Sequence, residues 1–198
     1  MPRIAGQVDE TKTQAILDAA LQVFSERGAA APMADIARRA GVSKQTLYNR
    51  FPTRTDLARA LARRRSDDIV APLSGEGDVE TILEAVATSL IAGICAPEKG
   101  SALRGLALIS PDAPDIALAV YEAGPGASIQ RLSAWLAEQH RRGYLEVPDP
   151  DHAAEMFTGM ALGHGHLRSL LGVDHPRLDR IDTCAREAAR RFVRAFAP

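Results

Sequence analysis

Five polar side chains lie close together between residues 44 and 50. They are Lys44, Gln45, Thr46, Tyr48 and Asn49. Amide, hydroxyl and ammonium groups of these kinds can hydrogen bond to the edges of bases and to phosphate oxygens. The cluster therefore suits a surface that contacts a nucleic acid, provided that one helix presents these side chains together.

The residues before this cluster have the spacing of two short helices joined by a tight turn. Ala37 is followed four residues later by Gly41 and ten residues later by Leu47. Two helices that cross steeply need a small residue at the crossing, Gly in the turn and an apolar anchor in the second helix, whose first turn Ser43 can cap. This pattern predicts a helix-turn-helix, with a plain helical corner as the alternative.

Charge is unevenly distributed along the chain of 198 residues, although its formal net charge is only −1. Residues 1–66 carry 12 basic and 6 acidic side chains, whereas residues 67–198 carry 12 basic and 19 acidic ones. A basic segment joined to an acidic body indicates that one end meets a polyanion. A charge run can also be merely a solvated face, which is how we interpret Arg63, Arg64 and Arg65.

Apolar residues recur with helical periodicity in nearly every patterned segment, and no segment alternates long enough to predict a strand. We therefore expect an all-α protein. Its clearest amphipathic helices run from Ile16 to Gly28, from Val79 to just before Pro97, from Asp149 to Leu171 and from Asp179 to Ala197.

Composition excludes several classes of protein. No apolar stretch is long enough to cross a bilayer, and the first ten residues lack the apolar core of a signal peptide. Cys95 and Cys184 are expected to be reduced. Together with the two preceding observations, this predicts a cytoplasmic protein. Common catalytic and nucleotide-binding motifs are missing, so we predict no enzyme and no cofactor.

The first 60 or so residues resemble the DNA-binding domain of the tetracycline-repressor (TetR) family of transcriptional regulators. The resemblance lies in Ile16–Ala20, Val23–Gly28, Asp35–Ala37, Ala40–Lys44, Thr46–Tyr48 and Phe51. It implies a three-helix helix-turn-helix DNA-binding domain over residues 1–55. Residues 56–198, which resemble the family's body in spacing more than in identity, would then form a helical ligand-binding and dimerisation domain.

The resemblance also implies roles for individual residues. Lys44–Arg50 would be the recognition helix, in which Gln45, Thr46 and Asn49 contact bases. The remaining contacts would go to phosphate. These come from Lys44, Tyr48 and Arg54, and from Thr11 and Lys12, which we expect at the start of the first helix.

A small effector would bind between the helices of the body. Rings and thioethers line adaptable apolar pockets, so the candidates for effector contact are Tyr121, Trp135, Met156, Phe157 and Met160. A stripe of this kind can equally be plain core. The expected effector is largely apolar, because no charged residue in these stripes marks a polar end.

Two segments depart from the family pattern. Ala31-Pro32-Met33 stands where the family has Ser or Thr at the start of the second helix, and Pro at the first helical position supplies no side-chain donor. Gly124-Pro125-Gly126 falls inside an expected long helix, where the loss of an amide hydrogen bond predicts a kink or a break.

Two further features concern metal binding and assembly. His164 and His166, two residues apart, would point to opposite sides of a helix, so we predict no metal site. Gly159 and Gly163 allow close helix approach, and with the stripe Ile181, Ala185, Ala188 and Phe192 they predict a four-helix dimer interface.

These observations predict a ligand-responsive repressor that binds a palindromic DNA operator as a homodimer and is released by a small, largely apolar effector. Two copies are needed because successive major grooves require two recognition helices. The alternative is a small-molecule binding protein or an enzyme whose helix-turn-helix no longer meets DNA.

Overall fold

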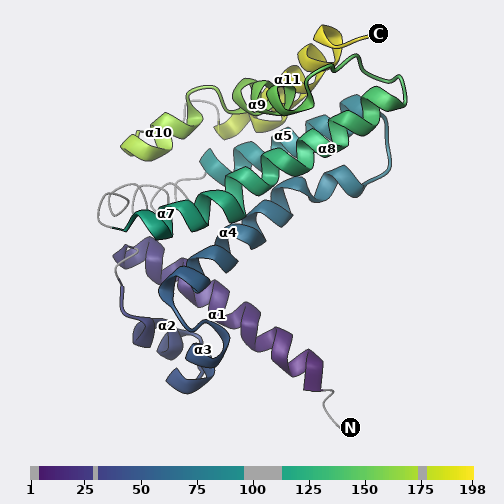
Figure 1. Cartoon of the computed structure of the whole chain (residues 1–198). Helices are drawn as coiled ribbons and strands as arrows, with labels where there is room; N and C mark the ends of the chain where they lie inside the picture. Colours follow the sequence, from purple (N-terminus) through teal and green to yellow (C-terminus); the bar gives the residue numbers. More distant parts are fainter. Residues whose placement is uncertain (1–4, 29–30, 96–112, 174–177) are drawn as a thin grey trace.

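The computed structural model describes residues 5–28, 31–95, 113–173 and 178–198. These residues form helices and connecting turns, with no strand among them, which confirms the predicted all-α class (Figure 1). The elements are α1 (Ala5–Arg27), α2 (Met33–Arg39), α3 (Lys44–Arg50), α4 (Arg54–Val70), η1 (Ala71–Ser74), α5 (Val79–Cys95), α7 (Pro114–Tyr121), η2 (Glu122–Gly126), α8 (Ala127–Arg141), α9 (Pro150–Leu162), α10 (Gly165–Leu171), η3 (Leu178–Arg180) and α11 (Ile181–Ala195).

The first three helices enclose a small core at one end of the molecule (Figure 1). Ile16, Ile36 and Leu47, from α1, α2 and α3, are fully buried there. Gly41 turns the chain with φ +66°, and the amide of Thr46 donates to the Ser43 hydroxyl, as predicted for the cap of α3. The local chemistry of these residues therefore builds the predicted helix-turn-helix.

Pro32 precedes the first helical position, which is the position that the sequence predicts for it. It is the N-cap residue of α2, with extended backbone (φ −63°, ψ 139°), and Met33 takes the first helical position. No side chain caps this helix start. The prediction that the position lacks a side-chain donor is confirmed, although Pro32 lies one residue before the position predicted for it.

Helix α4 joins the two parts of the molecule. It begins with a capping box, in which Thr53 and Asp56 each satisfy the other's backbone amide. Leu57 belongs to the core of the first three helices, whereas Ile69 and Val70 belong to the core of the body. Because α4 runs unbroken from residue 54 to residue 70, one rigid element spans the boundary predicted at residues 55 and 56.

The core of the body lies among α5, α8, α9 and α11. Phe157 and Phe192 meet edge to face at its centre, with ring centroids 5.2 Å apart. The amide of Glu146 donates to the carbonyl of Phe196 at 2.7 Å, which ties the loop after α8 to the end of α11.

The segment Gly124-Pro125-Gly126 forms the irregular turn that was predicted, but the chain does not break there. It is a π-helical turn, η2, that carries α7 directly into α8. A Cβ on Gly124 would lie 3.2 Å from the Cβ of Ala62, so the absence of a side chain lets η2 pack directly on α4.

The prediction of one long helix from residue 149 to residue 171 is wrong. The chain bends at Gly163, whose backbone (φ 49°, ψ −127°) is outside the helical region, and α9 and α10 lie on either side of it. Glycine adopts this conformation without steric cost. A Cβ on Gly159 or Gly163 would meet no neighbouring atom of the described residues within 4 Å, so these glycines form no tight helix crossing in that part of the chain.

The last helix is shorter than the predicted span of residues 179–197, since η3 precedes it and α11 ends at Ala195. Its apolar stripe is already covered, because Ala185, Ala188 and Phe192 are buried in the core that α11 forms with α5. These three side chains are thus used within the chain, and the dimer interface predicted from this stripe and the two glycines stays a prediction. Cys184 is a free, half-buried thiol, and the side chain of Cys95 lies outside the described part of the chain.

Candidate DNA-binding surface and ligand cavity

Helix α3 presents a polar face to solvent at the end of the molecule opposite α9 and α11 (Figure 1). Lys44, Gln45, Tyr48 and Asn49 are exposed, and the Tyr48 side chain is 47% accessible. Leu47 anchors the opposite face in the core. The four predicted side chains thus share one exposed surface, as contact with a DNA groove requires.

Thr46, the fifth predicted residue of this helix, is half-buried. Its hydroxyl lies 2.8 Å from the Ser43 hydroxyl, whose oxygen accepts from the Thr46 amide. The Thr46 hydroxyl therefore has a local partner, and its role as a base contact stays a prediction.

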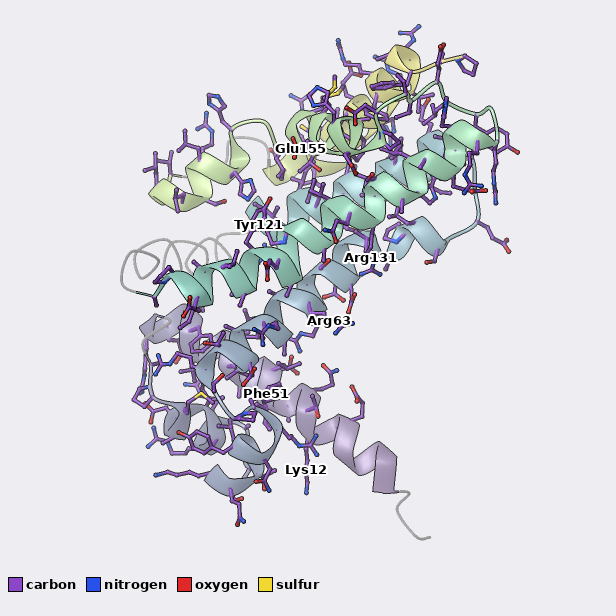
Figure 2. All side chains as sticks on the ribbon, in the orientation of Figure 1. Lys12, Phe51, Arg63, Tyr121, Arg131 and Glu155 are labelled. Atoms are coloured by element: carbon purple, nitrogen blue, oxygen red, sulfur yellow. The ribbon has the colours of Figure 1, made fainter. Side chains whose placement is uncertain are left out.

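Thr11 and Lys12 are exposed on α1, but they do not begin it. Because α1 starts at Ala5, the free amides of its first turn lie before Thr11, and the predicted position at a helix start is wrong. Lys12 nevertheless lies toward the end of the molecule that carries α2 and α3 (Figure 2). Its contact with phosphate stays a prediction. Such a contact would use the ammonium group of the side chain and no free backbone amide of a helix start.

Other charged residues brace the helix-turn-helix. Arg39 donates to both carboxylate oxygens of Glu26, at 2.9 and 2.8 Å, and this pairing holds the pKa of Glu26 below its ordinary value. Asp35 accepts from Arg27 of α1 at 2.8 Å. Arg50, for which the sequence predicts no separate role, donates to the Thr13 hydroxyl and so links α3 to α1. These bonds fix the direction in which α3 faces.

A cavity of about 360 Å³ lies behind α4, between it and α1, α5, α7 and α8. Its walls are mostly apolar, with side chains such as Leu61, Leu90, Ile116 and Ile129. A cavity of this size and lining is typical of a small-molecule site. Arg54, predicted as a phosphate contact, is half-buried at the start of α4 and also lines this cavity.

None of the five predicted effector residues lines this cavity. Tyr121, Met156 and Met160 are 60%, 42% and 41% exposed, Phe157 is fully buried in the core, and Trp135 packs against that core. Among the described residues, α9 contributes only Thr158 to the cavity, and Tyr121 of α7 and Trp135 of α8 lie on helices that line it through other residues.

Charged groups do mark a polar part of the cavity, contrary to the expectation from the sequence. Arg64 and Arg65 are half-buried and line it, while Arg63 on the same helix is exposed (Figure 2). The expectation of a solvated run thus holds for Arg63 alone. His166 of α10 lies at the edge of the cavity. Although the residue is exposed, the partial loss of water around its imidazole and the positive charge of Arg65 lower its pKa.

Two family models match this chain. The model of bacterial regulatory proteins of the tetR family matches residues 16–61, and the model of the AefR-like transcriptional repressor C-terminal domain matches residues 81–198. The second match alone covers more than half of the chain. The chain belongs to the TetR family of transcriptional regulators.

Known relatives and solved structures agree with this assignment. The transcriptional repressor LfrR of Mycolicibacterium smegmatis is 46% identical over 66 residues, which are 33% of this chain and 34% of LfrR, so the match spans about a third of that relative. The structure of the flavonoid-responsive regulator FrrA has 29% identity and a TM-score of 0.69, covering 94% of this chain and 97% of FrrA. A TetR-family regulator from Mesorhizobium loti MAFF303099 shares the fold, with a TM-score of 0.79, 24% identity and coverage of 96% and 98%.

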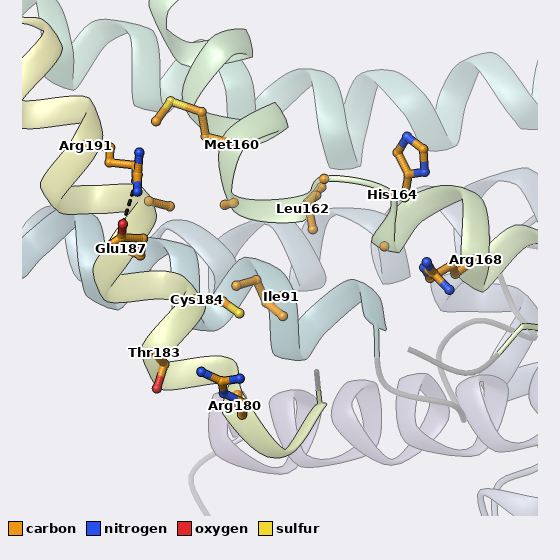
Figure 3. Close-up of a pocket in the computed structure, with 14 residues that line it drawn as sticks. Ile91, Met160, Leu162, His164, Arg168, Arg180, Thr183, Cys184, Glu187 and Arg191 are labelled. Atoms are coloured by element: carbon orange, nitrogen blue, oxygen red, sulfur yellow. Dashed lines mark hydrogen bonds and ion pairs between the residues drawn. The ribbon is translucent and has the colours of Figure 1, made fainter. Parts of the chain in front are cut away.

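This TetR-family protein has a second, more open hollow at its other end, of about 720 Å³ (Figure 3). It lies between the turn that joins α9 to α10 and the outer side of α11, with Ile91 of α5 at its base. Met160, His164 and Arg168 line one side. On the other side Arg191 donates to Glu187 at 2.6 Å, and this bond lowers the pKa of Glu187.

The described histidines of this TetR-family chain do not lie beside other potential metal ligands. Among the residues that the structure describes, no three His, Cys, Asp or Glu side chains come together as a metal site would require. His164 lines the open hollow and His166 the inner cavity. In the same part of the chain, no helix is long and apolar enough to span a membrane.

Proposed function

We propose that this protein is a ligand-responsive repressor that binds a palindromic operator as a homodimer and releases it when a small molecule enters the inner cavity. The observation that carries the proposal is the course of α4. Three residues separate the recognition helix from α4, and residues along the length of α4 line the cavity. A ligand in the cavity therefore touches the element that holds the DNA-binding end.

The exposed face of α3 supports the DNA contacts. Gln45 and Asn49 are four residues apart on one helix face, so both amides can reach neighbouring bases in a major groove. Lys44 and Tyr48 share this surface and suit phosphate oxygens. Thr46, Arg54, Thr11 and Lys12 complete the proposed set of DNA contacts.

Two of the matches support repression as the direction of regulation. LfrR is named a repressor, and residues 81–198 match the domain of AefR-like repressors. FrrA is named for its response to flavonoids, which supports a small-molecule effector for this chain as well. Release of DNA requires only that the effector prefer the shape that cannot bind the operator.

Dimerisation is proposed through the outer face of α9. Met156, Gly159 and Met160 lie on one face of this helix, and all three are exposed. Exposed thioether side chains beside an open glycine permit close approach of a second copy. The stripe of α11 that the sequence favoured is used within the chain, so α9 and the open hollow beside it take its place.

The dimer is tested with Met160→Arg, which would set two like charges against each other across a two-fold axis. We expect light scattering after gel filtration to show monomers that keep their helical circular dichroism. The matched control is Gln130→Arg, an exposed change on α8 that should leave the dimer intact. A stable Met160→Arg dimer would place the interface elsewhere.

DNA binding is tested by fluorescence anisotropy with a labelled fragment from upstream of the protein's own gene. We expect binding that weakens steeply as salt rises, because phosphate contacts release counterions. An unrelated fragment of equal length should bind much more weakly. Equal affinity for both fragments, or for neither, would contradict the proposed function.

A further inference from the structure

The inner cavity joins apolar walls to an excess of positive charge. Leu61, Ile69, Leu90 and Ile116 are among its apolar side chains. Its described lining residues also include three guanidinium groups and one carboxylate, namely Arg54, Arg64, Arg65 and Asp68. A ligand that matches this lining is apolar over most of its surface and negative at one end.

Arginine side chains favour an anionic ligand for two reasons. A guanidinium can form two parallel, charge-assisted hydrogen bonds with a carboxylate or a sulfonate. A neutral ligand can neither form such a pair of bonds nor compete with a carboxylate for the guanidinium of Arg64. The charge of the lining therefore discriminates between ligands of the same size and shape.

Arg64 also links the cavity to the DNA-binding end. Its Nη1 donates to Asp18 Oδ1 at 2.7 Å and to Gln14 Oε1 at 3.2 Å. Gln14 and Asp18 lie four residues apart on one face of α1, the helix that also carries Thr11 and Lys12. Because Asp18 is well exposed, this ion pair is weak enough for a competing anion to replace it.

Helix α1 meets the cavity a second time, through Leu21 and Phe24. Phe24 also belongs to the core of the helix-turn-helix. A ligand in the cavity thus contacts both an apolar part of α1 and the arginine that ties α1 to α4. Both contacts act on the packing of α1 against α4, on which the direction of α3 depends.

We propose that the effector is an amphipathic anion, an apolar skeleton with one acidic group, whose negative end binds Arg64 and Arg65 and takes Arg64 from Asp18. The inference rests on the proposed function, since it names the ligand class of the regulator's cavity. Loss of the bond to Asp18 loosens α1 from α4, and the ligand-bound shape then holds the operator less well.

The ligand class is tested with two fluorescent probes of the same ring system. One is 8-anilinonaphthalene-1-sulfonate, and the other is N-phenyl-1-naphthylamine, which lacks the sulfonate. We expect the anion to bind the full chain at least about tenfold more tightly, the effect of one charge-assisted hydrogen bond. Decanoate should displace it and 1-decanol should not.

Arg64→Gln and Arg65→Gln should each remove most of this preference for the anion. The matched control is Arg63→Gln, because Arg63 lies on the same helix but faces solvent. Equal binding of the two probes, binding of neither, or an equal effect of the Arg63 change would overturn the inference.

The link to α1 is tested with Asp18→Asn. Removal of the competing carboxylate should tighten binding of the anionic probe by roughly two- to fivefold, as expected for an exposed ion pair. The control is Asp67→Asn, whose carboxylate pairs with Arg131 of α8 instead. No change in Asp18→Asn would overturn the exchange of partners.

The outcomes separate this inference from the proposed function. If N-phenyl-1-naphthylamine released the operator as readily as the sulfonate, the inference of an anionic effector would be wrong. The proposed repressor function would be unaffected. Failure of the ligand-free protein to bind the operator would instead remove the proposed function, whatever the probes do.

Discussion

Charged side chains brace neighbouring helices in both parts of the molecule, but in the body some of them also line a cavity. Arg39 and Arg27 hold α2 against α1 through Glu26 and Asp35, around a closed apolar core. In the body, Arg64 and Arg65 line a cavity of about 360 Å³. One region therefore keeps a fixed surface, and the other holds a cavity whose size and lining are typical of a small-molecule site.

The backbone differs between the two regions in the same sense. The helix-turn-helix uses a capped start at Ser43 and a left-handed glycine at Gly41, both of which define one geometry. The body instead contains a π-helical turn at η2 and a bend at Gly163. Irregular helices of this kind occur where function requires local adjustment.

The largest expected effect concerns the closed core. Leu47→Ala should lower the free energy of unfolding by about 2–5 kcal/mol, because it removes a fully buried side chain and leaves a cavity. Denaturation in urea, followed by circular dichroism, measures this loss. Tyr48→Ala, the exposed neighbour, should change stability little, and a comparable loss there would show that the two faces of α3 are not distinct.

A smaller effect is expected where η2 meets α4. Gly124→Val should cost about 1–3 kcal/mol of unfolding free energy, because the added atoms collide with Ala62. It should also weaken the response to ligand, since Gly124 lines the cavity. Thermal denaturation tests the first effect and probe binding the second.

The control for that change is Gly159→Ala, at a helical position with open space around it. There the substitution should raise stability by up to about 1 kcal/mol through helix propensity. If Gly124→Val were as well tolerated as Gly159→Ala, the contact between η2 and α4 would have room for a side chain. The two glycines would then not differ in packing as the structure indicates.

The smallest expected effect is one of pH. The pKa of His166 is lowered, chiefly by the partial loss of water around its imidazole and also by Arg65, so the folded protein holds fewer protons at this site than the unfolded chain. Stability from His166 is therefore constant above its ordinary pKa of 6.5 and falls as pH drops below that value.

His166→Gln should flatten this dependence between about pH 7 and pH 5 in urea denaturation. The carboxylates with lowered pKa, such as Glu26 and Glu187, act below their ordinary pKa of 4.5 and do not interfere. An unchanged slope in His166→Gln would mean that the imidazole is as well solvated in the folded protein as in the unfolded chain.

Sequence chemistry predicted the helix-turn-helix almost residue by residue. Gly41, Ser43 and Leu47 lie close together in the sequence and act on their immediate neighbours. Their residue types therefore already specify the turn, the helix cap and the apolar anchor. The exposed face of α3 follows from the same register. Long-range partners at this end, such as Arg50 with Thr13, could not be predicted, because their spacing carries no periodic signal.

The body was predicted only in class. Helical periodicity indicates which side of a helix is buried but not which element covers it, so the stripe of α11 was assigned to a second copy although α5 covers it. The residues that line the cavity were missed for a related reason. In the sequence, Arg63, Arg64 and Arg65 form one run of positive charge, which predicts a solvated face. Which of them line the cavity depends on which side of α4 faces the body, and the sequence does not give this orientation.

Base reading by the exposed face of α3 is tested by the affinity of α3 variants for operators with single base-pair changes. Gln45→Ala and Asn49→Ala should each abolish discrimination at particular, symmetrically placed base pairs, by about 1–3 kcal/mol. Lys44→Gln should weaken all sequences alike and lower the salt slope by about 0.9. Uniform weakening by all three variants, with base preferences unchanged, would contradict the account.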